Sequence, residues 1–254
     1  TWEIDLNDAS TKLSGRTKAI IPVHLYGIPC DMHSMQHFAE LHDLLVIEDA
    51  AQSFGTFYQG RACGTHGLCG AFSFYANKVI TTGEGGAVVT HDAELASSLR
   101  FFRGQAQSPE RRFWHAEIGF NYRMTDVHAA IGVAQMQRVN GILDARRRVA
   151  STYYDLLQDT LKFPESKGVT PWLVTGLLPE DALFSRVEAR LESYNIEVRP
   201  VFVPMHRLPM YDRPDTQFPR SSYVADNGIS LPTYPTLNEE DVAYIASKVI
   251  EVLS

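Results

Sequence analysis

A single lysine at the end of an aromatic segment carries the clearest chemical signal in this chain. Lys78 closes the run 72–78 (FSFYANK), and a glycine-rich turn at 83–86 follows it. A second signal lies upstream, where the apolar run 44–47 ends in Glu48 and Asp49. A lysine amine forms a Schiff base with an aldehyde cofactor, and a carboxylate keeps a pyridine nitrogen protonated so that the ring withdraws electrons. A lysine and an acid at neighbouring strand ends are what pyridoxal phosphate chemistry requires.

Lys78 is expected to hold the cofactor and, once released by an amino donor, to move a proton between substrate and cofactor. A lysine suits both tasks because burial and nearby positive charge lower its pKa readily. The alternative is a surface lysine before a turn, but the aromatic strand and the glycine turn would bury its stem. For Asp49, a helix cap or an ordinary salt bridge stays an alternative to pairing with the pyridine nitrogen.

The elements around these residues alternate between strand and helix. Apolar runs typical of buried strands occupy residues 18–25, 44–47, 70–75 and 86–90. A short helix is expected after the turn at 29–31, and this order predicts βαβ units in a mainly parallel sheet. Ligands in such sheets bind beyond the carboxyl ends of the strands, where the pattern places both Asp49 and Lys78. We expect the strand at 86–90 to be fully buried.

Two domains are predicted. Thr125 is expected to cap a long helix whose apolar positions reach Leu143, and this helix would carry the chain from one domain to the next. We assign residues 1–138 to a large cofactor-binding domain and residues 139–254 to a smaller α+β domain. The second domain is expected to close with a helix capped by Asn238.

Composition excludes several classes of function. With 254 residues, 44% of them hydrophobic, and a formal net charge of -7, the chain can bury a core but offers no broad surface for nucleic acid. No apolar stretch reaches membrane-spanning length, so we expect a cytoplasmic protein without a membrane partner. The three cysteines lack paired metal spacing and are expected to be reduced thiols that hold no metal.

Six segments, taken together and in order, resemble the DegT/DnrJ/EryC1/StrS family of nucleotide-sugar aminotransferases. They are 22–27 (PVHLYG), 48–52 (EDAAQ), 72–78, 82–86 (TGEGG), 121–124 (NYRM) and 204–211. The resemblance implies the aspartate-aminotransferase-like fold (fold type I), a mainly parallel α/β domain with a smaller α+β C-terminal domain. The loop 102–114 is most similar to the perosamine-synthase-like branch, which aminates C4 of GDP-4-keto-6-deoxymannose.

The resemblance also implies how further residues hold the cofactor. Gln52 matches the family residue that approaches the 3-hydroxyl group, and Ser73 would hydrogen-bond the phosphate if it shares a strand face with Tyr75. Asn121 matches an asparagine that reaches the phosphate of the partner subunit's cofactor, so the site would be shared within a homodimer. Local polar roles stay open: a loop glutamine, a serine bonded to its own backbone, and a turn asparagine.

Three residues are expected to meet the substrate. His206 and Tyr211 resemble residues that line the sugar-nucleotide cleft. Arg123 would bind a phosphate or only anchor its loop, and both interpretations stay open. The implied reaction moves an amino group from an amino acid, expected to be glutamate, to a keto-sugar nucleotide.

Two other functions were weighed. In a related dehydratase branch a histidine replaces the lysine, so Lys78 argues against that chemistry. A non-catalytic relative is the other alternative, because family members have an additional N-terminal segment whose helix start holds the cofactor phosphate. The chain begins at Thr1, after that segment. We therefore expect a longer gene product, and weak or no cofactor binding by these residues alone.

Overall fold

The computed structural model describes residues 2–165 and 169–254, which form two compact units, Trp2–Gly141 and Ile142–Ser254. Each unit has its own sheet and helices. Among the described residues, no helix combines the length and the apolar character needed to cross a bilayer.

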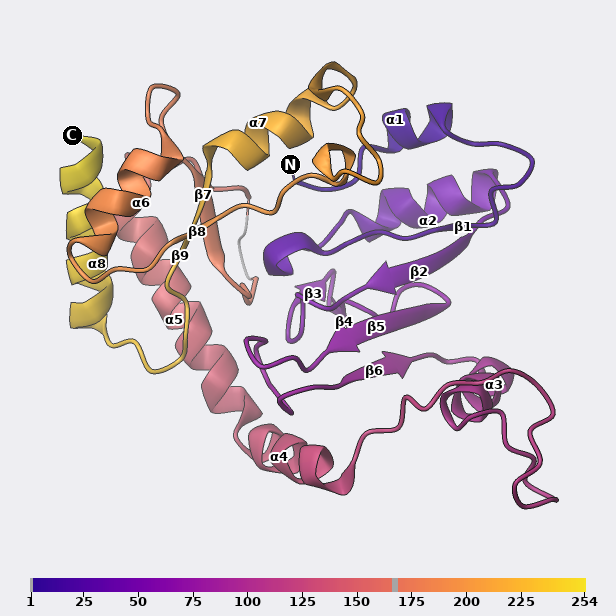
Figure 1. Cartoon of the computed structure of the whole chain (residues 1–254). Coiled ribbons are helices and arrows are strands. Elements are labelled where there is room, and N and C mark those ends of the chain that lie inside the picture. The colour runs from indigo at the N-terminus through magenta and orange to yellow at the C-terminus, as the bar shows by residue number, and fades with distance from the viewer. Residues whose placement is uncertain (1, 166–168) are drawn as a thin grey trace. The chain divides into compact units, whose positions relative to one another are not determined.

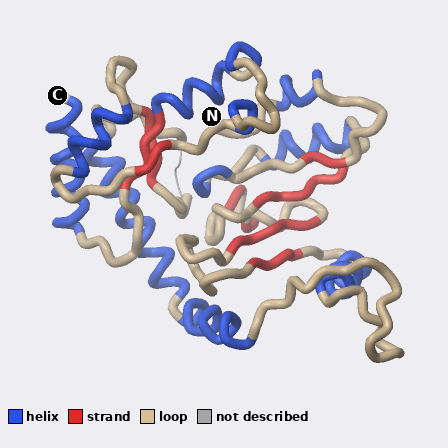
Figure 2. Tube along the Cα trace, in the orientation of Figure 1, coloured by secondary structure: helices blue, strands red, loops and turns tan. Residues whose placement is uncertain are grey.

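The first unit is built on a four-stranded sheet in the order β1-β2-β5-β6 (Figures 1 and 2). Its strands are β1 (Ala19–Ile20), β2 (Leu45–Asp49), β5 (Cys69–Ser73) and β6 (Gly86–Val89). The first three run parallel, and β6 runs antiparallel to β5. A two-stranded ribbon, β3 (Phe57–Tyr58) with β4 (Arg61–Ala62), lies between β2 and β5 in the chain. The mainly parallel α/β arrangement predicted from the sequence is confirmed.

Four helices belong to this unit: α1 (Leu6–Thr11), α2 (Met32–Leu41), α3 (Ala93–Arg103) and α4 (Asp126–Gln137). Asp31 caps α2 by accepting a hydrogen bond from the backbone N–H of Ser34 at 3.0 Å. Apolar residues spaced three and four apart give α2 one buried face, which packs with Ile20 and Val46 of the sheet. This core fixes β2, the strand that carries Asp49.

The fourth strand differs from the prediction. Val88 and Val89 of β6 are 49% and 37% exposed, so the expectation of a fully buried strand is wrong. β6 stands last in the described sheet, with β5 as its one neighbour there. An apolar run reads the same in a central strand and an edge strand, because periodicity does not say what covers it.

Thr125 caps a helix as predicted, since its hydroxyl accepts a hydrogen bond from the backbone N–H of His128 at 3.3 Å. The long helix is in two pieces, however. α4 ends at Gln137, and α5 (Val139–Leu157) begins after Arg138, whose φ of -110° lies outside the helical range.

The second unit packs helices against a three-stranded antiparallel sheet in the order β7-β9-β8. The strands are β7 (Val174–Leu177), β8 (Arg199–Pro200) and β9 (Gly228–Leu231), and the helices after α5 are α6 (Phe184–Glu192), α7 (Pro219–Asn227) and α8 (Glu239–Leu253). Leu157, Leu191 and Ile229 are fully buried in its core. Asn238 begins α8 with a reciprocal cap to Asp241, as the sequence predicts.

Candidate functional site

Asp49 and Ser73 are the last residues of two adjacent parallel strands, β2 and β5. Because the strands are in register with Asp49 opposite Ala71, both ends open at the same edge of the sheet. Lys78 follows β5 by one short turn, in which its backbone N–H donates to the carbonyl of Tyr75 at 3.0 Å. The structure therefore brings these three residues to the carboxyl edge, where ligands of parallel sheets bind.

Lys78 lies close enough to Asp49 to be affected by its negative charge. Burial lowers the pKa of the half-buried Lys78 ammonium below the ordinary lysine value, and the negative charge of Asp49 acts in the opposite direction. An amine with a lowered pKa has a larger neutral fraction at a given pH, and the neutral amine is the nucleophile. The local chemistry is thus that of a nucleophilic lysine beside a carboxylate.

Gln52 is oriented by an unusual backbone segment. Its carbonyl oxygen, Oε1, accepts a hydrogen bond from the backbone N–H of Tyr26 at 2.6 Å. Tyr26 is 2% exposed and has a φ of 56°, a left-handed conformation that costs energy for a residue with a side chain. Since the oxygen is committed to Tyr26, the amide NH2 group of Gln52 is left to act as a donor.

Ser73 makes the local contact that the sequence left open. Its hydroxyl oxygen accepts a hydrogen bond from the backbone N–H of Tyr75 at 3.3 Å. The hydroxyl proton can still be donated to a ligand oxygen. The turn after Lys78 is tied back to the same strand, because Phe74 donates its N–H to the carbonyl of Gly85 and accepts from Thr82, both at 2.9 Å.

Asn121 and Arg123 lie elsewhere in the first unit. Both are exposed, and Asn121 pairs as an isolated bridge with Gly104, at the end of α3. β6 carries the chain away from the carboxyl edge to α3, and Figure 1 shows the segment after α3 running back from there to α4. Asn121 therefore lies at the α3 end of this segment, whereas Met124, the neighbour of Arg123, lies against Gly85 of the turn that follows Lys78.

His206 and Tyr211 belong to the second unit. The His206 ring is 6% exposed, its Nε2 lies 2.8 Å from Oδ1 of Asp215 and 3.1 Å from Oγ of Ser222, and it stacks on Phe218. Both polar contacts of the ring use Nε2. Tyr211 is 52% exposed.

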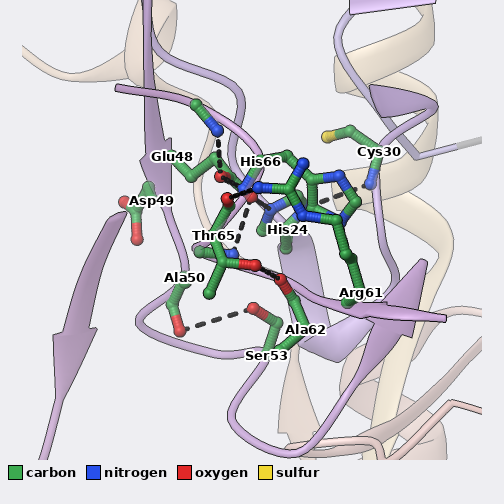
Figure 3. A network of polar contacts seen from close by, with 12 residues as sticks. His24, Cys30, Glu48, Asp49, Ala50, Ser53, Arg61, Ala62, Thr65 and His66 are labelled. Atoms are coloured by element: carbon green, nitrogen blue, oxygen red, sulfur yellow. Dashed lines mark hydrogen bonds and ion pairs between the residues drawn. The ribbon is translucent and has the colours of Figure 1, made fainter. Parts of the chain in front are cut away.

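Two buried residues next to the site received no role from the sequence. Glu48 and His24 are fully buried, and Oε2 of Glu48 lies 2.9 Å from Nε2 of His24 (Figure 3). The signal was present, because Glu48 stands two residues after the buried Val46 and so shares its inward face. A carboxylate at an inward strand position is rare unless it is paired.

Comparisons with known proteins agree with this geometry. The model of the DegT/DnrJ/EryC1/StrS aminotransferase family matches residues 1–250. The chain is 40% identical to GDP-perosamine synthase of Escherichia coli O157:H7 and 41% identical to that of Caulobacter vibrioides, covering 100% of this chain and 71% of each relative. Among solved structures, Helicobacter pylori PseC, an aminotransferase of pseudoaminic acid biosynthesis, has a TM-score of 0.91 at 27% identity, over 99% of this chain and 71% of that one. The chain belongs to the DegT/DnrJ/EryC1/StrS aminotransferase family.

Proposed function

We propose that this protein transfers an amino group from an amino acid to a keto-sugar nucleotide, with pyridoxal phosphate as its cofactor. The observation that carries the proposal is that Asp49 ends one parallel strand and acts electrostatically on Lys78, which follows the end of the adjacent one. The donor set fits the cofactor, since an amine, a carboxylate, an amide NH2 group and a hydroxyl follow the same two strands.

Each of these groups has a task that its chemistry allows. Lys78 would hold the cofactor covalently and would move the proton that the reacting carbon loses or gains. Asp49 would accept the N–H of the pyridine ring, Gln52 would donate its amide to the 3-oxygen, and Ser73 would donate its hydroxyl to the phosphate. When bound, pyridoxal phosphate supplies an electron-withdrawing ring that stabilises negative charge on the reacting carbon.

The substrate follows from the relatives. Two of them, named GDP-perosamine synthase, are 40% and 41% identical to the whole chain, which favours GDP-4-keto-6-deoxymannose as acceptor. Glutamate is the donor that we propose. The product would be a deoxyamino sugar on a nucleotide, made in the cytoplasm. We assign His206, Tyr211 and Arg123 to the binding of the sugar nucleotide.

We also propose that the enzyme is a homodimer whose subunits share each active site. In one subunit Asn121 lies away from the carboxyl edge, so it would serve the partner's cofactor phosphate. The helix α4 supports an interface, because none of its residues is buried while Val127, Ile131 and Val133 are 72%, 42% and 59% exposed. Residues 1–138 would form the cofactor-binding domain and residues 139–254 the small domain.

The direct test is the product. Purified protein with pyridoxal phosphate, nitrogen-labelled glutamate and GDP-4-keto-6-deoxymannose should yield a GDP-sugar that carries the label at C4, read by mass spectrometry. A UDP-linked 4-keto sugar serves as the matched acceptor and should react far more slowly. Loss of a sugar hydroxyl without a gain of nitrogen would mean a dehydratase, and no reaction with either acceptor would contradict the proposed substrate class.

A further inference from the structure

The side chain of Glu48 is fully buried, and its carboxylate accepts four hydrogen bonds. Its Oε1 receives the backbone N–H groups of His66 and Gly67, each at 2.6 Å. Its Oε2 receives the backbone N–H of Gly64 at 2.7 Å and Nε2 of His24 at 2.9 Å (Figure 3). Burial disfavours the charged form, but these bonds outweigh it and lower the pKa of Glu48. The side chain is therefore an ionised carboxylate with every lone-pair direction used.

His24 is held in one tautomer. Its Nδ1 accepts a hydrogen bond from the backbone N–H of Cys30 at 3.1 Å, so the ring proton must sit on Nε2. That proton is the one donated to Glu48. The imidazole thus links the backbone N–H of Cys30 to the carboxylate of Glu48 through hydrogen bonds at its two ring nitrogens.

The backbone of His24 also binds Asp49, the next residue of β2. The backbone N–H of His24 donates to the carbonyl of Asp49 at 3.1 Å, and the N–H of Asp49 donates to the carbonyl of Pro22 at 2.9 Å. His24 therefore fixes two consecutive residues, Glu48 through its side chain and Asp49 through its backbone. A shift at either contact would move the end of the strand.

The loop that binds Glu48 is pressed against the sheet. A Cβ atom at Gly67 would lie 2.5 Å from the carbonyl oxygen of Val46, and one at Gly64 would lie 2.5 Å from the ring of Phe72. Gly64 also has a φ of 86°, which side chains other than glycine rarely adopt. These positions let three backbone N–H groups converge on one carboxylate.

We infer that Glu48 and His24 are positioning residues that set the place and direction of the Asp49 carboxylate toward the cofactor ring nitrogen. Successive side chains of a strand point to opposite faces, so locking Glu48 on the buried face fixes the direction of Asp49 on the other. The inference rests on the proposed function, in which Asp49 accepts the ring N–H. Groups that orient the ligands of a metal typically change affinity or activity about 10- to 100-fold when removed, and we expect an effect of that order here.

Two substitutions of one residue separate positioning from folding. His24→Asn keeps an acceptor for the N–H of Cys30 but cannot reach Glu48, whereas His24→Gln keeps a donor that reaches Glu48 and gives up the Cys30 contact. Glu48→Gln removes the charge and sets an NH2 group against N–H donors, and Glu40→Gln, the same change at an exposed site of α2, is its control.

The readouts are the dissociation constant for pyridoxal phosphate, the NMR shift of its isotope-labelled ring nitrogen in the bound state, and thermal unfolding without cofactor. His24→Asn should bind about tenfold or more weakly and move the shift toward the unprotonated value, and His24→Gln should keep the wild-type shift. The comparison of His24→Asn with His24→Gln tests the inference even if Glu48→Gln does not fold. Both variants keep the Glu48 carboxylate and its three backbone N–H donors.

A His24→Asn protein with the wild-type shift and affinity would overturn the inference, whatever its unfolding temperature. A different result would count against the proposed function itself. If Asp49→Asn also leaves the ring-nitrogen shift unchanged, or the wild-type protein binds no cofactor through Lys78, then the site does not work as proposed.

Discussion

Glu48 and Asp49 are consecutive residues of β2, and their carboxylates leave the strand on opposite sides (Figure 3). Glu48 is fully buried among four N–H donors, whereas the half-buried Asp49 acts electrostatically on Lys78. Glu48 thus uses all its acceptor positions to build the strand end. Asp49 accepts one local hydrogen bond at Oδ1, from the backbone N–H of Ala51 at 3.0 Å, and has further acceptor positions for a ligand.

Asp49→Asn removes the charge that would keep the ring nitrogen protonated, while keeping the size of the side chain. The rate of amino transfer from glutamate should fall by about a hundredfold or more, because a preorganised charge at the reacting group is lost. Single-turnover absorbance kinetics with glutamate measure this rate. Asp144→Asn, at an exposed site of α5, is the matched control, and an equal fall in both proteins would contradict the role of Asp49.

The lowered pKa of Lys78 predicts how the reactivity of its amine changes with pH. A lysine whose pKa lies below the ordinary value loses its proton at a lower pH, so its amine becomes reactive earlier as the pH rises. Lys248 is the internal reference, because its hydrogen bond to Glu251 raises its pKa. Trace acetylation of the cofactor-free protein across pH, read by peptide mass spectrometry, should give Lys78 the lower half-point. The reverse order would refute the burial argument.

The shared site predicts complementation between two inactive variants. A heterodimer of one Lys78→Ala and one Asn121→Ala subunit, isolated by two different affinity tags, contains one site with both residues intact. It should recover about half of the wild-type activity, although each parent homodimer is nearly inactive. Activity no higher than that of the parents would mean that Lys78 and Asn121 serve a site within one subunit or that Asn121 has no role.

The core of the second unit offers a paired test of stability. Leu157 is fully buried and its neighbour Leu156 is 44% exposed, although both lie on α5. Leu157→Ala should cost about 2–5 kcal/mol of unfolding free energy, since it leaves a cavity in the core. Leu156→Ala should cost less than about 1 kcal/mol. Urea unfolding measures both, and equal costs would mean that this face of α5 is packed differently.

Much of the first unit could be predicted because its signals are local. The runs that end at Asp49 and Ser73 were predicted as strands, and the parallel pairing of β1 with β2 follows from the helix α2 between them. The parallel pairing of β2 with β5 has only the β3–β4 ribbon between the strands. The caps at Thr125 and Asn238 were also readable from residue type. The exposure of β6 could not be read, because it depends on which strand lies beside it.

The inward position of Glu48 could be inferred from the strand pattern, but the identity of its hydrogen-bond donors could not. Its donors come from His24 and from a loop at residues 64–67, far apart in the chain, and three of them are backbone N–H groups that every residue type except proline carries. The placement of Asn121 away from Lys78 likewise depends on the direction of β6. The roles of Gln52, Ser73, Arg123, His206 and Tyr211 stay predictions.

The most direct measurement is the visible absorption spectrum of the protein with pyridoxal phosphate, before and after glutamate, beside that of Lys78→Ala. The wild type should show the yellow band of lysine-bound cofactor, glutamate should bleach it, and Lys78→Ala should not form it. A spectrum that is the same in both proteins, or a wild-type band that glutamate leaves unchanged, would contradict amino transfer through Lys78.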